Sequence, residues 1–142
     1  MIRVCPSCSQ KNRISVAQAM ETARCGQCKN TLPAIAEPID ATPELFDEIL
    51  RDAKVPALVD FWAEWCGPCR RAAPEVKKAA HEMAGRAFVL KVDTEAHPDL
   101  AMRYNVQSIP NFVVVKGGRV VLQQPGLVDH SEMVRWLTDA GV

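Results

Sequence analysis

The chain has 142 residues, of which 48 % are hydrophobic and 24 % charged, and its formal net charge is zero. This composition is ordinary for a globular protein, and it offers neither the net basic charge of a nucleic-acid binder nor the apolar run of about 20 residues that spans a bilayer. We therefore expect no nucleic-acid partner and no membrane partner.

The first part of the chain, residues 1–36, differs in charge from the rest. It carries five Lys or Arg residues against a single acidic residue, and residues 1–30 contain no Phe, Trp or Tyr. A unit of this size cannot bury enough surface to fold alone, and below about 40 residues a metal or disulfides are usually needed. The start, MIRVCPSC, lacks a basic segment followed by an apolar core, so we expect no signal peptide and a cytoplasmic location.

All six cysteines fall in Cys-x-x-Cys pairs, and two of these pairs, CPSC and CGQC, lie in residues 1–36. Their spacing is typical of a zinc ribbon in which four thiolates close a tetrahedral Zn²⁺ site, here Cys5, Cys8, Cys25 and Cys28. Two alternatives remain: four free thiols on a disordered leader, or two further redox couples. Apart from the cysteine pairs, the sequence shows no internal repeat.

Beyond a proline-rich linker, apolar residues alternate between strand-like and helix-like spacing, which predicts an α/β domain over residues 37–142. A mixed central sheet with helices on both faces follows from this order. The expected elements are an edge strand near Ile39, a helix from Thr42, a buried strand over 55–63, a helix over 69–85, a buried strand over 87–93, a short helix over 97–105, a hairpin over 111–124 and a last helix after Asp129.

The third pair, in WCGPC, has different surroundings. It follows a buried strand and opens a helix, so Cys66 is expected at a helix N-terminus, where unpaired N–H groups favour a thiolate anion. Cys69 lies on the same side one turn later, close enough for a disulfide. Gly67 and Pro68 suit the tight entry into the helix. This arrangement predicts a catalytic dithiol.

Two segments, VDFWAEWCGPCRRAAP (59–74) and SIPNFVVVKGG (108–118), resemble the thioredoxin family. The resemblance covers residues 37–142, and with the four-cysteine annex in front the chain is similar to the zinc-containing, thioredoxin-2 type. It implies a thioredoxin fold preceded by a small zinc-ribbon-like domain, and a thiol–disulfide oxidoreductase that reduces protein disulfides. It also implies one structural Zn²⁺, no organic cofactor, and reduction by an NADPH-dependent flavoprotein, thioredoxin reductase.

The resemblance also assigns roles around the dithiol. Cys66 is expected to attack the substrate, Cys69 to resolve the mixed disulfide, Asp60 to act as a buried proton acceptor and Lys91 to pair with Asp60. The residues expected to contact substrate are Trp65, Gly67, Pro68, Ile109, Pro110 in a cis peptide bond, and Gly126. Simpler readings stay open for three of them: Asp60 as a structural hydrogen-bonded acid, Lys91 as an ordinary strand lysine and Gly126 as a plain turn residue.

Two other functions compete with the reductase. A zinc-ribbon adaptor would use the second domain only for docking, but both cysteines of the third pair are present. An oxidase or isomerase normally works in an oxidising compartment. We further expect that oxidation of the four thiolates at Cys5, Cys8, Cys25 and Cys28 would eject the metal and change the shape of this annex beside the active site.

Overall fold

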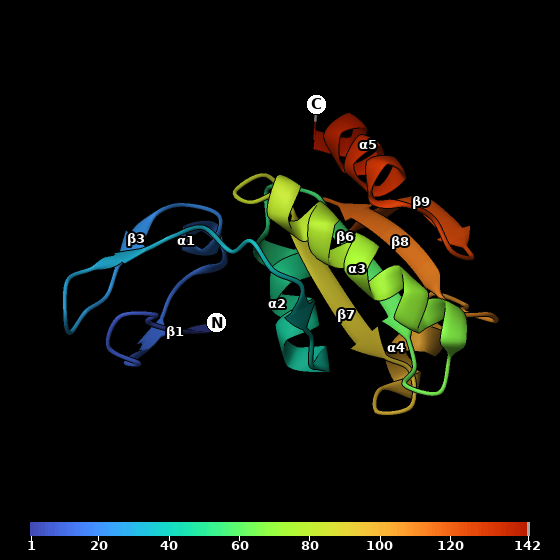
Figure 1. Cartoon of the computed structure of the whole chain (residues 1–142), viewed down its shortest axis with the longest axis horizontal. Helices are drawn as coiled ribbons and strands as arrows, with labels where there is room; N and C mark the ends of the chain where they lie inside the picture. Colours follow the sequence, from blue (N-terminus) through green and yellow to red (C-terminus); the bar gives the residue numbers. More distant parts are fainter. Residues whose placement is uncertain (142) are drawn as a thin grey trace.

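The computed structural model describes residues 1–141. Its main body is a five-stranded sheet in the order β5-β7-β6-β8-β9 (Figure 1). The two central strands, β6 and β7, run parallel, whereas β8 is antiparallel to β6 and β9 is antiparallel to β8. The strand bounds are β5 Ile39–Asp40, β6 Ala57–Trp62, β7 Phe88–Asp93, β8 Asn111–Lys116 and β9 Arg119–Pro125. The sheet is therefore mixed, as the sequence predicted.

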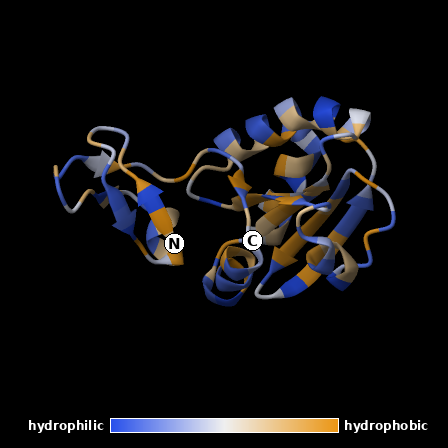
Figure 2. Ribbon diagram, turned by 90° about the horizontal axis from the view of Figure 1, so that it is seen from below, coloured by the Kyte–Doolittle hydropathy of each residue, from blue (hydrophilic) through white to orange (hydrophobic). Residues whose placement is uncertain are grey.

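Four helices cover the two faces of this sheet: α2 Pro43–Asp52, α3 Gly67–Glu82, α4 Pro98–Arg103 and α5 His130–Gly141. One apolar cluster joins α3 and α5 to Leu58, Phe112 and Val114 of the sheet. A second cluster joins α2 and α4 to the opposite face through residues such as Phe46 and Leu100. Figure 2 shows the resulting pattern, with mainly hydrophobic central strands and helices that alternate in hydropathy.

The annex, residues 1–36, contains regular structure that the sequence did not predict. Two short hairpins pair β1 (Ile2–Val4) with β2 (Lys11–Arg13) and β3 (Ala23–Arg24) with β4 (Thr31–Leu32). A single-turn helix, α1 (Val16–Ala19), lies between them. Ser15 and Gln18 form a capping box at its start, a signal that was present in the sequence as Ser-x-x-Gln.

The two hairpins repeat one backbone conformation with a shift of 20 residues, although the sequences differ. The amide of each first cysteine donates to a carbonyl five residues on, in Cys5 to Gln10 and in Cys25 to Asn30. The residue after each second cysteine has a positive φ, 65° at Ser9 and 64° at Lys29. The repeat is therefore one of backbone structure, and beyond the cysteine pairs it has no counterpart in the sequence.

The annex packs against α2 and the turn after α3. Ile14, Val16 and Ala19 belong to the same apolar cluster as Phe46 and Ile49 of α2. At the other contact, Gly85 has a φ of +79°, and a Cβ there would lie 3.3 Å from the carbonyl oxygen of Met20. A side chain at position 85 would thus strain the backbone and press against the carbonyl oxygen of Met20 in the annex.

This contact places the annex at the C-terminal end of α3, whereas Cys66 precedes its N-terminal end (Figure 1). The 16-residue helix between them is roughly 24 Å long at 1.5 Å per residue. The annex therefore does not lie beside the active site as expected, while loss of metal and a change of its shape on oxidation stay predictions. Within residues 1–141, no helix is both long enough and apolar enough to cross a bilayer.

Candidate active site and metal centre

The first candidate site lies where β6 leads into α3. Cys66 is the N-cap residue of α3, and its Sγ accepts a hydrogen bond of 3.1 Å from the backbone N–H of Cys69. The two cysteines form a disulfide, with their Cα atoms 5.2 Å apart. The helix begins at Gly67 and not at Cys69 as predicted, because Gly67 and Pro68 occupy its first two positions, where a missing proline N–H costs nothing.

The loop that precedes β8 packs against the dithiol. The Ile109–Pro110 peptide bond is cis, as the resemblance implied. The carbonyl oxygen of Ile109 lies 3.7 Å from the Sγ of Cys66. The carbonyl of Pro110 in turn accepts a 2.8 Å hydrogen bond from the N–H of Gly126, which has a φ of +93° that favours glycine. Gly126 thus ties the end of β9 to this loop, and no atom lies within 4 Å of the position that its Cβ would take.

Trp65 forms the exposed rim of the site. Its side chain is 66 % exposed, and its indole Nε1 donates a 2.9 Å hydrogen bond to the carboxylate of Glu95. Next to it lies an open groove of about 320 Å³ lined by Trp65, Thr94, Ala101, Val106, Gln107, Ser108 and Ile109. Sequence reasoning missed Glu95. Its one sequence signal is its place just past the carboxyl end of β7, the parallel neighbour of β6.

Asp60 is buried in β6, the strand that precedes Cys66, with only 1 % of its surface exposed. Its Oδ1 atom has no hydrogen-bond partner among the described residues. Burial raises the pKa of Asp60 to about 7, while the positive charge of Lys91 opposes part of that rise. The missing hydrogen bond disfavours the structural reading of Asp60, and the raised pKa gives a carboxyl group that can take up a proton near neutral pH.

Lys91 lies beside Asp60 in the parallel register of β7 and β6. The ion pair expected between them does not form within 4.0 Å in the described part of the chain. The Nζ of Lys91 instead lies over the ring of Trp62, 4.2 Å from its centroid. The ammonium group of Lys91 is held over the indole ring of Trp62 and does not contact the Asp60 carboxylate. Lys91 therefore influences the pKa of Asp60 through the electric field of its charge.

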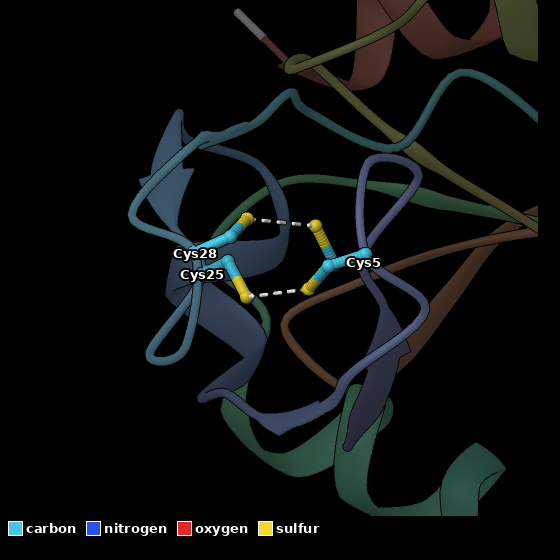
Figure 3. A group of neighbouring side chains, drawn as sticks. Cys5, Cys25 and Cys28 are labelled. Carbon is cyan, nitrogen blue, oxygen red and sulfur yellow. Dashed lines mark hydrogen bonds between the residues drawn. The ribbon is translucent and has the colours of Figure 1, made fainter.

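The second candidate site is formed by the two cysteine pairs of the annex, which face one another (Figure 3). The Sγ of Cys5 lies 3.7 Å from that of Cys28, and the Sγ of Cys8 lies 3.6 Å from that of Cys25. All four sulfur atoms lie within 4.8 Å of one another. Tetrahedral ligands at a Zn–S distance of about 2.3 Å stand about 3.8 Å apart, so the four thiols fit a zinc ion.

Backbone amides favour thiolates at this site. N–H groups of Cys28 and Gln27 lower the pKa of Cys25 to about 6, and the N–H group of Cys8 is the main cause of a lowered pKa at Cys5. At Cys8 the amide of Gln10 acts in the same direction, but burial and the neighbouring thiols together raise its pKa to about 12. Without a metal, a proton is therefore held more tightly by Cys8 than by Cys5 or Cys25. A bound cation would displace such protons from the sulfur atoms.

Comparison with known proteins agrees with the active-site geometry. The sequence model of the family described as Thioredoxin matches residues 37–139. The chain belongs to the thioredoxin family. Thioredoxin C-3 of Corynebacterium nephridii is 37 % identical over 137 residues, which cover 96 % of this chain and 93 % of that protein. Thioredoxin 1 of Nostoc sp. is 40 % identical over 106 residues, covering 75 % and 96 %.

Solved structures support the same assignment. A mutant thioredoxin from Halobacterium salinarum NRC-1 aligns with a TM-score of 0.68 at 29 % identity, covering 75 % of this chain and 93 % of that one. As a thioredoxin, the chain is a protein-disulfide oxidoreductase. Its four-cysteine annex is consistent with the zinc-binding type that the sequence suggested.

Proposed function

We propose that this thioredoxin reduces disulfides of protein substrates through Cys66 and Cys69. The Cys66 thiolate attacks one sulfur of a substrate disulfide, so that a mixed disulfide forms and the second substrate sulfur leaves as a thiolate. The N-cap position supports this role, because the free N–H groups of α3 stabilise negative charge on the Cys66 sulfur. The carbonyl of Ile109 lies 3.7 Å from the Cys66 sulfur. The proposed surface for the substrate chain comprises Trp65, Gly67, Pro68, Ile109, Pro110 and Gly126.

Cys69 completes the reaction. Its thiol gives up a proton, and the resulting thiolate attacks Cys66, so that the substrate leaves reduced and the Cys66–Cys69 disulfide forms. Asp60 is the proposed proton acceptor, since its pKa of about 7 matches the working pH. Lys91 is the proposed regulator of that carboxyl group, because its charge limits how far burial raises the pKa of Asp60.

The cycle requires an electron donor, which we propose to be an NADPH-dependent flavoprotein, thioredoxin reductase. It would reduce the Cys66–Cys69 disulfide, and the chain itself would carry no organic cofactor. The proposed compartment is the cytoplasm. Four cysteines at metal-ligand spacing are compatible with it, because structural disulfides are rare in that compartment and paired cysteines there more often bind a metal.

The proposed role of Cys5, Cys8, Cys25 and Cys28 is to hold one structural Zn²⁺ ion. With four thiolates the coordination sphere is complete and leaves no position for a substrate. The bound ion would hold the two hairpins together, because the hairpins form two separate sheets. Accordingly, the proposed division of the chain is a metal-binding unit over 1–36 and an oxidoreductase unit over 37–142.

The observation that carries the reductase is the Cys66–Cys69 pair at the start of α3, together with a buried carboxyl group of pKa about 7 on the preceding strand, β6. Its test is a turnover assay with a reporter protein disulfide and NADPH plus a thioredoxin reductase. We expect NADPH oxidation that depends on the chain, with the Cys66–Cys69 disulfide detected by mass spectrometry when the reductase is left out. Turnover without any disulfide between these two residues would contradict the proposal.

A further inference from the structure

The two halves of the metal centre have few direct links. The first half, residues 2–13, supplies Cys5 and Cys8, and the second, residues 22–32, supplies Cys25 and Cys28. Each half has its own two-stranded sheet, and the two sheets are not hydrogen-bonded to each other. Besides the sulfur–sulfur contacts, one side-chain hydrogen bond runs from Arg3 to the carbonyl of Pro33, just past the second half. The side-chain hydrogen bonds that cross between the two halves themselves, within residues 1–32, all involve Asn12.

Asn12 lies in β2 and makes three hydrogen bonds. Its Oδ1 accepts a 2.9 Å hydrogen bond from the backbone N–H of Gly26. Its Nδ2 donates to the carbonyl of Gln10 at 3.1 Å and to the Sγ of Cys25 at 3.5 Å. The orientation of the amide is fixed, because the Gly26 N–H can only donate and so must face the oxygen.

The same strand position in the second half holds Leu32, 20 residues later. Leu32 is fully buried and packs with Cys5 and Cys25. The repeated backbone therefore places an apolar side chain on one side of the sulfur cluster and an amide on the other. This difference is unexplained by the fold alone, since leucine fills the equivalent place in an equivalent hairpin.

We propose that Asn12 is a positioning residue of the metal centre, which holds the Cys25–Cys28 pair in its binding geometry and donates to the Cys25 sulfur. This inference rests on the proposed zinc site. Four thiolates around Zn²⁺ leave a net charge of −2, and an N–H donor spreads the charge of one of them. The hydrogen bond to Gly26 keeps the second cysteine pair facing the first. Both effects slow the loss of the metal.

The test uses the full-length, zinc-loaded protein and follows zinc release to an excess of chromogenic chelator. Asn12→Leu introduces the residue that Leu32 provides at the equivalent position of the second half, and it removes all three hydrogen bonds of the Asn12 side chain. Asn12→Asp is nearly isosteric and keeps the acceptor for Gly26, but it replaces the donor with a negative charge. Gln10→Leu is the matched control, because its side-chain amide bonds only the carbonyl of Lys11.

We expect zinc release to be about 10-fold faster or more in Asn12→Leu and faster than wild type in Asn12→Asp, with Gln10→Leu within about twofold of wild type. Release at the wild-type rate from both Asn12 variants would overturn the inference. If Asn12→Leu does not fold, the Asp variant decides. A wild-type protein that carries no zinc would instead overturn the metal site itself, and Asn12 with it.

A spectroscopic measurement separates the donor from a purely structural effect. In the Co²⁺-loaded protein, loss of the N–H donor raises the energy of the sulfur lone pairs on Cys25. The thiolate-to-cobalt charge-transfer band should therefore move to lower energy in both Asn12 variants and stay in place in Gln10→Leu. An unmoved band in the Asn12 variants would contradict the proposed contact with sulfur.

Discussion

The annex and the start of α3 contain cysteine pairs of identical spacing in different surroundings. The pair at Cys66 and Cys69 lies at the start of a 16-residue helix, follows a strand with a buried carboxyl group and forms a disulfide. The pairs of the annex sit in tight turns between strands of two or three residues. Each of these annex pairs faces the other, with sulfur–sulfur distances of 3.6 and 3.7 Å.

The difference shows that spacing alone does not decide the chemistry of a Cys-x-x-Cys pair. Two sulfur atoms isolated from other ligands can only react with each other or with a substrate. Four sulfur atoms in mutual contact share protons or a cation, and they leave no room for a substrate. The surroundings of each pair, and not its spacing, therefore predict catalysis in one region and metal binding in the other.

The largest effect is expected from exchanging one cysteine in each region. Cys66→Ser should reduce turnover of a reporter protein disulfide to the uncatalysed rate, because the nucleophile is gone. Cys69→Ser should trap a mixed disulfide with the substrate, visible by mass spectrometry. Cys5→Ser is the control, since it should lose zinc and keep turnover. Wild-type turnover in Cys66→Ser would refute the assignment of the nucleophile.

Metal removal should affect only the other region. A strong chelator should unfold the hairpins around Cys5, Cys8, Cys25 and Cys28, because their binding free energy is largely their folding free energy. Hydrogen exchange should show loss of amide protection in β1–β4 while β6, β7 and β8 stay protected. Turnover should persist. Loss of protection across the central sheet at the same chelator concentration would mean that the two units do not fold independently.

Asp60→Asn tests the buried acid and should act on both rate and stability. Removal of the proton acceptor should slow turnover by about 10-fold or more near pH 7. The same change should stabilise the fold at pH 8 by roughly 2–4 kcal/mol, because a shift from 3.8 to about 7 in the pKa of Asp60 corresponds to at most ~4 kcal/mol of buried-charge cost.

The sign of this effect fixes its pH dependence. The folded state binds the Asp60 proton more tightly than the unfolded state, so wild-type stability falls as pH rises from about 4 to about 7. The advantage of Asp60→Asn should therefore appear in that window and vanish below it. Urea unfolding of both proteins at pH 4, 6 and 8 provides the measurement. If Asp60→Asn and wild type were equally stable at all three pH values, the Asp60 charge would not destabilise the fold.

The smallest effect concerns the contact between the two regions. Val16 is buried and belongs to the apolar cluster that includes Phe46 of α2. Val16→Ala should lower the free energy of unfolding by about 2 kcal/mol, from lost transfer energy and a residual cavity. Urea unfolding measures this change. Glu21→Ala, an exposed position just past α1, changes no buried surface, and an equal loss there would show that the docking of α1 contributes little.

The fold of residues 37–142 was largely predictable, because its strands and helices have the apolar periods expected of buried elements. The continuous apolar run before Trp62 and the helix after Thr42 both appear as predicted. The annex was not predictable in the same way. Its strands are too short for a periodic pattern, and their conformation is set by turns at residues such as Ser9 and Lys29, whose positive φ is not typical of serine or lysine.

The candidate sites show the same division. The cysteine pairs and the residues around them predicted both candidate sites, and the resemblance to the thioredoxin family predicted the role of Asp60. The position of the Lys91 ammonium over Trp62 could not be predicted, because a strand register fixes which residues are neighbours and not the path of a long side chain. Glu95 and Asn12 were missed for a related reason, since both act through contacts between segments distant in sequence.

Thiol counting with metal analysis tests most directly whether the three pairs do two different jobs. The reduced native protein is treated with an excess of a thiol reagent, and its zinc content is measured in parallel. We predict one zinc per chain and two rapidly reacting thiols, which mass spectrometry assigns to Cys66 and Cys69, with four more appearing only after a chelator is added. Six rapidly reacting thiols in a protein without zinc would contradict this account.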